Sequence, residues 1–248
     1  KEVGFLRFFM LCIMYPFSRA RFYIKRLRWR LITNQEVHDV FTTIYEKNLW
    51  LSNESVSGDG SEVAYTESLR AWLIDNIPKY RIETIVDAPC GDFNWMRHVI
   101  SHVDVSYLGI DIVDKLIESN TQAYGCEGIN FKKLNIISEP IPRCELLFVR
   151  DCLFHFSNQD INRFLANIEE ADYKYLLTTS HIVDENFVNT DIRTGDFRII
   201  DLFKPPFSFN KDHILDFVQD YPNDHSKPKQ MILIRKEFVP TRLRVDEN

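Results

Sequence analysis

The chain has 248 residues, of which 45% are hydrophobic and 27% charged, and its net charge is −6 at pH 7. This length and composition are typical of one globular domain with an extension and a sizeable core. The acidic net charge disfavours nucleic acid as a partner. The five cysteines form no Cys-x-x-Cys pair, which favours reduced thiols in a cytoplasmic protein over a disulfide framework or a metal site.

Residues 1–32 form an extension of unusual composition. An apolar run from Val3 to Phe17 is followed by six basic residues, which are Arg19, Arg21, Lys25, Arg26, Arg28 and Arg30. The run is shorter than the roughly 20 residues of a spanning helix, and its basic residues follow it, unlike those of a signal peptide. Three interpretations stay open. The helix lies as a peripheral anchor on the inner, anionic face of the membrane, it packs on the domain or a partner subunit, or it spans the membrane once.

Residues 33–80 are expected to form a helical cap region. Apolar residues recur at near-helical spacing from Gln35 to Leu51, and a second helix is expected from about Thr66 to Pro78. A polar loop, Ser52 to Glu62, separates the two helices.

Strands and helices alternate through residues 81–248, which we expect to form the main domain. The predicted strands are Thr84–Asp87, Ser106–Asp111, Ile129–Leu134, Glu145–Arg150, Lys174–Thr179, Phe197–Phe203 and Lys229–Lys236. The predicted helices are Phe93–Ile100, Val113–Tyr124, Asn158–Ala171 and Lys211–Asp220. The alternation predicts an α/β fold with a Rossmann-like, doubly wound, mainly parallel seven-stranded sheet after an N-terminal helical extension.

The turn after the first strand, Asp87-Ala88-Pro89-Cys90-Gly91-Asp92-Phe93, indicates a cofactor site. A dinucleotide fold needs several glycines here, so that backbone amides can hold a pyrophosphate. This turn has one glycine and two carboxylates, which favour a cationic cofactor with an amino group, such as S-adenosylmethionine. Asp111 ends the next strand about 20 residues on, where a carboxylate grips ribose hydroxyls. Alternatively, Asp111 caps the following helix.

These motifs resemble the class I S-adenosylmethionine-dependent methyltransferases. The family's acidic, glycine-rich first motif is matched at Asp87 and Gly91, while Pro89 and Phe93 stand where glycine is usual. The form Asp-Ala-Pro-Cys-Gly-Asp-Phe, together with Tyr-Thr-Glu-Ser-Leu at Tyr65–Leu69, resembles a bacterial subgroup of the family. The resemblance covers roughly residues 50–236 and implies S-adenosylmethionine as cofactor.

The resemblance also implies a set of cofactor-binding residues. Asp87 and Gly91 would line the methionine end, Asp111 would bind the ribose, and Ile112 would pack on the adenine. Asn135 stands where the family often has an acidic residue near the adenine amino group. The implied cofactor site is Asp87, Ala88, Pro89, Gly91, Asp111, Ile112, Asn135 and Arg150.

Two residues after the fourth strand are candidates for catalysis. The carboxyl ends of the strands form the ligand crevice of a doubly wound sheet, which places Asp151 and His155 where cofactor and acceptor meet. Either could take a proton from an acceptor hydroxyl. Alternatively, Arg150 and Asp151 form a structural network, and backbone groups bind a half-buried His155.

Residues around and after the fifth strand are expected to line the acceptor pocket. They are His181, Arg193 and Arg198, and the two arginines could clamp a phosphate or carboxylate. The alternative is a solvated loop.

The sequence therefore predicts methyl transfer from S-adenosylmethionine to an oxygen of a small polar or saccharide acceptor. The rivals are an NAD(P)-dependent oxidoreductase and a catalytically silent family member that binds the cofactor without turnover. No oligomeric state is indicated.

Overall fold

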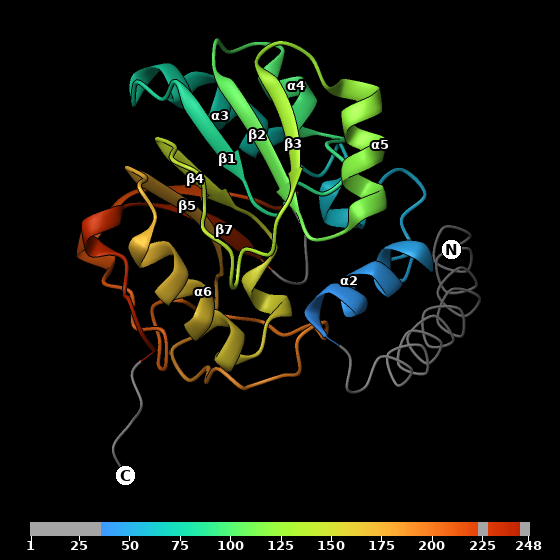
Figure 1. Ribbon diagram of the computed structural model, residues 1–248. Helices are drawn as coiled ribbons and strands as arrows, with labels where there is room; N and C mark the ends of the chain where they lie inside the picture. The colour runs from blue at the N-terminus through green and yellow to red at the C-terminus, as the bar shows by residue number, and fades with distance from the viewer. Residues whose placement is uncertain (1–35, 223–227, 244–248) are drawn as a thin grey trace, which may run out of the picture.

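One seven-stranded sheet forms the centre of the computed structural model, which describes residues 36–222 and 228–243. The predicted extension over residues 1–32 lies outside this part of the chain. The strands, in chain order, are β1 (Thr84–Asp87), β2 (Ser106–Asp111), β3 (Ile129–Lys133), β4 (Leu146–Val149), β5 (Tyr175–His181), β6 (Ile214–Gln219) and β7 (Lys229–Arg235). Their order in the sheet is β3-β2-β1-β4-β5-β7-β6 (Figure 1).

Strands β1 to β5 are parallel, and β7 pairs antiparallel with both β5 and β6. Every residue of β4 and β5 is buried, as expected for parallel strands covered on both faces. The predicted Rossmann-like, mainly parallel fold is therefore confirmed. The carboxyl ends of β1, β2 and β4 meet at one edge of this sheet.

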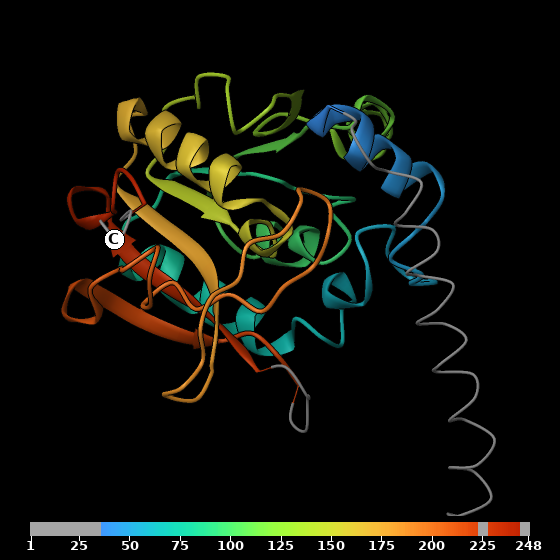
Figure 2. The ribbon, with the colours of Figure 1, turned by 90° about the horizontal axis from the view of Figure 1, so that it is seen from below.

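Helices cover both faces of the sheet. They are α2 (Val37–Glu46), α3 (Glu67–Lys79), α4 (Met96–Ile100), α5 (Asp114–Tyr124) and α6 (Asn158–Glu170). Figure 2 shows the sheet between α6 on one side and α3 on the other. No helix within the described ranges is long and apolar enough to cross a membrane.

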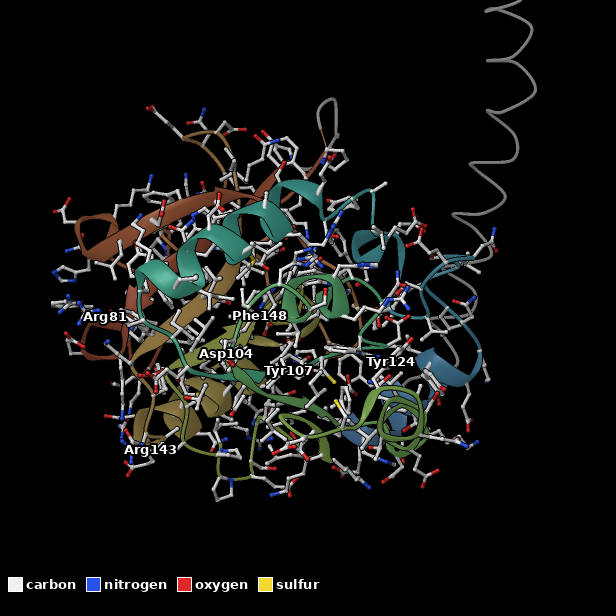
Figure 3. All side chains as sticks on the ribbon, turned by 90° about the horizontal axis from the view of Figure 1, so that it is seen from above. Arg81, Asp104, Tyr107, Tyr124, Arg143 and Phe148 are labelled. Atoms are coloured by element: carbon white, nitrogen blue, oxygen red, sulfur yellow. The ribbon has the colours of Figure 1, made fainter. Side chains whose placement is uncertain are left out.

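The core follows from the alternation of side chains along the strands. Val86 and Leu147 pack on one face with the apolar stripe of α6, whereas Ile85 and Phe148 pack on the other with α3 and α4. In Figure 3, Tyr107 and Phe148 lie in the interior and Arg143 lies at the outer edge. Ser157 caps the start of helix α6, and its hydroxyl accepts a bond from the Asp160 amide at 3.1 Å.

Two predicted elements are wrong. Residues 211–220, expected to be a helix, form a short 3₁₀ turn over Lys211–His213 and then strand β6. Residues 197–203, expected to be a strand, pair with no strand. Instead, the Ile200 carbonyl accepts from the His181 amide at 2.8 Å, and the Leu202 amide donates to the Ser180 hydroxyl at 3.0 Å. The sheet thus has seven strands, but its sixth lies later in the chain than predicted.

Candidate active site

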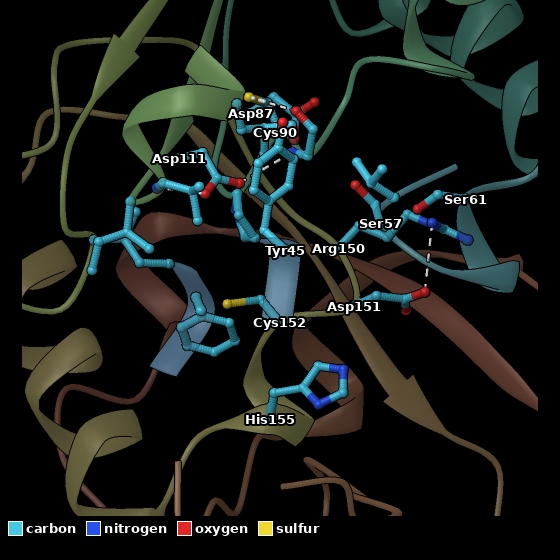
Figure 4. Close-up of a pocket in the computed structure, with 18 of the residues that line it drawn as sticks. Tyr45, Ser57, Ser61, Asp87, Cys90, Asp111, Arg150, Asp151, Cys152 and His155 are labelled. Carbon is cyan, nitrogen blue, oxygen red and sulfur yellow. Dashed lines mark hydrogen bonds and ion pairs between the residues drawn. The ribbon is translucent and has the colours of Figure 1, made fainter. Parts of the chain in front are cut away.

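A pocket lies at the carboxyl edge of the sheet. The space between its walls, including open solvent at its mouth, is about 990 Å³. Nine predicted site residues line it, and they are Asp87, Pro89, Gly91, Asp111, Ile112, Asn135, Arg150, Asp151 and His155. Ala88, His181, Arg193 and Arg198 do not line it. In Figure 4, Asp87, Cys90 and Asp111 gather at one end and Cys152 and His155 at the other.

The turn after β1 owes its shape to left-handed backbone at two positions. Gly91 has a φ of +55°, and a Cβ there would meet the Ser57 hydroxyl at 2.3 Å. Phe93 has a φ of 57°, a conformation that favours glycine. Its buried ring lies 4.9 Å from the ring of Tyr107 and 5.2 Å from that of Phe131. Aromatic packing therefore stabilises a left-handed backbone at Phe93, the position where the class I methyltransferase motif usually has glycine.

Asp87 and Asp111 place buried carboxyl groups in the pocket. Tyr107 donates a hydrogen bond to Asp87 at 2.7 Å, but burial prevails and raises the pKa of Asp87 to about 8. Asp111 accepts from the amides of Gly91 at 3.3 Å and Val113 at 3.1 Å. Burial outweighs these bonds and raises its pKa to about 6. The N-cap of α5 is Val113, so Asp111 ties the turn to the helix start without being the cap.

The second carboxylate of the turn, Asp92, points away from the pocket. It accepts from the Val56 amide at 3.0 Å and from the Ser57 hydroxyl at 3.4 Å. Asn94 adds bonds to Glu54 at 2.8 Å and to the Ser61 carbonyl at 3.1 Å. The argument that both carboxylates face a cationic cofactor is thus wrong for Asp92, which fastens the loop over residues 52–62 (the 52–62 loop) to the turn.

The far end of the pocket is apolar. Leu116, Leu134 and Ile136 line it beside Ile112. The side-chain oxygen of Asn135 accepts from the Ile137 amide at 3.0 Å. Because a carbonyl oxygen has two lone pairs, it can accept one further bond. This end can hold a flat, largely apolar ring.

A network of four charges, three of them buried, joins the end of β4 to the β6–β7 connection. Arg150 donates two bonds to Asp220, both at 2.9 Å, and one to the Gly60 carbonyl at 2.7 Å. Lys229 donates to Asp151 at 2.5 Å and to Asp220 at 2.9 Å. Burial would raise the pKa of Asp151, but Arg150 and Lys229 outweigh it and lower that pKa to about 2.

Sequence reasoning missed two members of this network. Asp220 and Lys229 flank the connection between β6 and β7, far along the chain from Arg150. The one available signal was a lysine at the start of a strongly apolar strand. A buried lysine requires a partner, but the sequence does not say which residue it is.

His155 lies where the pocket meets the segment after β5. Its Nδ1 lies 2.8 Å from the Asp196 carbonyl oxygen. A carbonyl only accepts, so Nδ1 carries the hydrogen, and in the neutral ring Nε2 is the basic nitrogen. The imidazole lies 5.6 Å from the Trp50 ring and 4.6 Å from the Phe154 ring, measured between centroids.

The three residues predicted to bind the acceptor do not line the pocket. His181 is buried, and its Nδ1 accepts from the Ile200 amide at 3.2 Å. Arg198 is also buried, and it donates to Asn158 at 2.7 Å and to the carbonyls of Thr190 and Phe156 at 2.5 and 2.9 Å. Arg193 is exposed. Direct contact of these three with an acceptor stays a prediction.

Several solved methyltransferase structures are similar to this fold. Human N-acetylserotonin methyltransferase, in complex with SAM, superposes with a TM-score of 0.56 at 14% identity over 88% of this chain and 67% of its own. A Burkholderia thailandensis 1,6-didemethyltoxoflavin-N1-methyltransferase with bound S-adenosylhomocysteine gives 0.59 at 13% identity over 80% and 86%. Mitomycin 7-O-methyltransferase gives 0.57 at 14% identity over 84% and 60%.

No family model matches the sequence, and no curated protein matches it. At these identities the structural likenesses establish a Rossmann-like methyltransferase fold.

Proposed function

We propose that the protein is an S-adenosylmethionine-dependent methyltransferase. The observation that carries the proposal is the pair of buried carboxyl groups, Asp87 and Asp111, which face one pocket from the ends of adjacent strands. The fold supports it, since similar structures were crystallised with S-adenosylmethionine or S-adenosylhomocysteine. The missing glycines and the acidic lining disfavour the pyrophosphate of a nicotinamide cofactor.

The pocket suits this cofactor at both ends. Asp87 offers a negative charge to an amino group beside the turn of Ala88, Pro89 and Gly91. Asp111 can accept from both ribose hydroxyls, while Ile112 and Asn135 flank the apolar end. When bound, the cofactor supplies a methyl group on a positively charged sulfur.

We assign proton acceptance to His155. The low pKa of Asp151 makes its carboxylate a weak base at neutral pH. His155, in contrast, has its Nδ1 hydrogen directed at the Asp196 carbonyl, which holds Nε2 as the proton acceptor. Nε2 would take the proton of the acceptor hydroxyl as that oxygen bonds to the methyl carbon and the sulfur–carbon bond breaks, and the Asp196 carbonyl would stabilise the resulting imidazolium. Asp151 holds a fixed negative charge beside the reacting atoms.

The methyl acceptor is, on this proposal, the hydroxyl of a small polar molecule or a saccharide. Related folds methylate both nitrogen and oxygen, as the names of the N1- and 7-O-methyltransferases say. Oxygen is favoured here because a hydroxyl needs a base such as His155 as its proton leaves.

Calorimetry with S-adenosylhomocysteine and with NAD tests the cofactor. We expect binding of the first and none of the second, and binding of NAD alone would overturn the proposal. Transfer of a labelled methyl group from S-adenosylmethionine into a cell extract then separates an enzyme from a silent binder. Absence of any labelled product with the cofactor bound would favour the silent binder.

We also propose that residues 1–32 hold the enzyme at the inner face of the membrane, in keeping with their basic and apolar composition. Co-sedimentation with anionic liposomes, with and without these residues, tests this. Equal sedimentation of the two forms would reject it.

A further inference from the structure

Aromatic rings surround His155, which lines the pocket. The rings of Trp50 and Phe154 lie 5.6 Å and 4.6 Å from the imidazole, and that of Phe197 lies 6.0 Å away. Trp50 lines the pocket, whereas Phe154 is buried and Phe197 is exposed just outside the lining. We call the two accessible rings, Trp50 and Phe197, the aromatic wall.

Backbone hydrogen bonds fix the segment that carries Phe197. The Gly195 amide donates to the His155 carbonyl at 2.7 Å, and the Arg198 amide donates to the Phe154 carbonyl at 3.2 Å. The Asp196 carbonyl lies between them and accepts from the imidazole. Phe197 is therefore held in place with 40% of its surface exposed. A fixed, exposed aromatic ring beside a base is a surface that can bind a ligand's apolar face.

The pocket offers little to a negatively charged acceptor. Among its lining residues within the described part of the chain, Arg150 is the one Lys or Arg, whereas Asp87, Asp111 and Asp151 are acidic. Arg150 is bound to Asp220, and with Lys229 the network is two positive and two negative charges. Among the described lining residues, an acceptor phosphate would meet carboxylates and no Lys or Arg outside this network.

The arginines after β5 do not change this balance. The guanidinium of Arg198 donates to three oxygens of the protein, and the residue as a whole is 4% exposed. Arg193 is exposed, and its charge lowers the pKa of Asp196. Burial has the larger effect and raises that pKa. Neither arginine lines the pocket.

We propose that the methyl acceptor is a neutral hydroxyl carried on a ring with an apolar face, which packs on the aromatic wall and presents its oxygen to His155. The inference rests on the proposed function and narrows its substrate class by excluding acceptors that carry a phosphate beside the reacting hydroxyl. A phenol and the apolar face of a sugar share this chemistry.

The test uses the full chain saturated with S-adenosylhomocysteine and two matched pairs of probes, observed by saturation-transfer NMR. Hydroquinone is compared with 4-hydroxyphenyl phosphate, and methyl glucoside with glucose 1-phosphate. We expect the neutral member of at least one pair to bind more tightly than its phosphorylated partner. The pair that binds distinguishes a phenol from a sugar.

Two variants locate the binding. Phe197→Ala should weaken the neutral probe about threefold to tenfold, as expected for the loss of one aromatic contact. Phe217→Ala is the matched control, since Phe217 is 47% exposed on β6 and contacts Phe203 instead. It should leave probe binding unchanged. Tighter binding of the phosphorylated probes, no binding of either neutral probe, or an equal effect of both variants would overturn the inference.

The outcome is separable from that of the proposed function. Calorimetry first measures the affinity for S-adenosylhomocysteine in each variant. If the unaltered protein does not bind S-adenosylhomocysteine, the result counts against the proposed function. The probes are then tested on the protein without cofactor. Intact cofactor binding with failed probes counts against the acceptor class alone.

Discussion

Asp87 and Asp111 are buried acids whose environment, in the free protein, favours the protonated form. The pKa of Asp87 is raised to about 8 and that of Asp111 to about 6, in both cases mainly by burial. A ligand with a positive charge and ribose hydroxyls favours the ionised forms of both. Binding of such a ligand is therefore coupled to loss of protons.

This coupling predicts that cofactor affinity rises with pH. Below about pH 6 both groups are protonated and must release protons on binding, whereas above about pH 8 both are already ionised. We expect the affinity for S-adenosylhomocysteine to increase between these limits, with proton release at pH 7. Calorimetry in two buffers of different ionisation enthalpy measures it. Asp87→Asn is the control for titration of the ligand itself, and a release unaltered in this variant would contradict the assignment.

Replacement of His155 separates chemistry from cofactor binding. His155→Gln should lower kcat by about 100-fold or more, the contribution typical of a general base, and leave the affinity for S-adenosylhomocysteine unchanged. His102→Gln, which alters an exposed histidine bonded to its own helix end, is the control. A kcat within a few-fold of the unaltered enzyme would assign the base elsewhere.

Single residues show how far the sequence predicted the site. Asp87, Asp111 and His155 are predictable because each lies at or shortly after the carboxyl end of a parallel strand. In a parallel sheet these ends meet at one edge. The position of Asp92 next to Gly91 predicts that its carboxylate faces a cationic cofactor. The backbone instead turns this carboxylate toward the 52–62 loop. Lys229 was missed because its partners lie far away in sequence.

Among the elements outside the sheet, the 52–62 loop forms one wall of the pocket. Val56, Ser57 and Ser61 line it, and the loop is bound through Asp92, Asn94 and Arg150 to the ends of β1 and β4. The loop therefore positions one side of the cofactor site without belonging to the sheet.

Release of this loop should weaken cofactor binding. Asp92→Ala removes the acceptor for Val56 and Ser57, and bonds to a charged group contribute about 1.5–3 kcal/mol each. We expect the affinity for S-adenosylhomocysteine to fall about tenfold or more, with partial recovery in Asp92→Asn. Ser101→Ala, at an exposed serine bonded to its own helix, should have no effect. An unchanged affinity in Asp92→Ala would show that the loop holds its position by other contacts.

The network after β4 predicts a large effect on stability. Lys229→Met leaves Asp151 and Asp220 with Arg150 alone, and breaking a buried ion pair costs about 3–5 kcal/mol. Urea unfolding measures this change, and Lys115→Met, at an exposed ion pair, should change the free energy of unfolding little. Comparable effects of the two variants would contradict the importance of burial.

The same network makes stability depend on acid. The pKa of Asp151 in the folded protein, about 2, lies below its usual value of 3.8. Asp151 therefore stabilises the fold above about pH 4, and this contribution is lost as the pH falls toward 2.

The elements that sequence predicted well are those with one dominant pattern. Strands β1 and β2 were predicted to the residue, since short apolar runs bounded by turns mark buried parallel strands. Strand β6 was mistaken for a helix because it is an edge strand with half its residues exposed, and only its pairing with β7 decides its form.

At the scale of the whole molecule, the pocket joins distant parts of the chain. Its lining runs from Val37 in α2 to Phe156 before α6. A ligand that binds only the folded protein stabilises it by about 2.7 kcal/mol at 100 times its Kd. We expect S-adenosylhomocysteine to raise Tm by several degrees and NAD to leave it unchanged, as measured by calorimetry. A Tm insensitive to S-adenosylhomocysteine would oppose the proposed site.

The position of α2 and the 52–62 loop ahead of the sheet has a consequence for synthesis on the ribosome. Asp92, the hydrogen-bond partner of Val56, is synthesised 36 residues later, and Arg150, the partner of Gly60, is synthesised 90 residues later. Phe41 meets Phe156 only after the fourth strand has been made. The apolar faces of this early segment therefore leave the exit tunnel before their partners have been made. During that interval they are exposed apolar surface of the kind that chaperones bind.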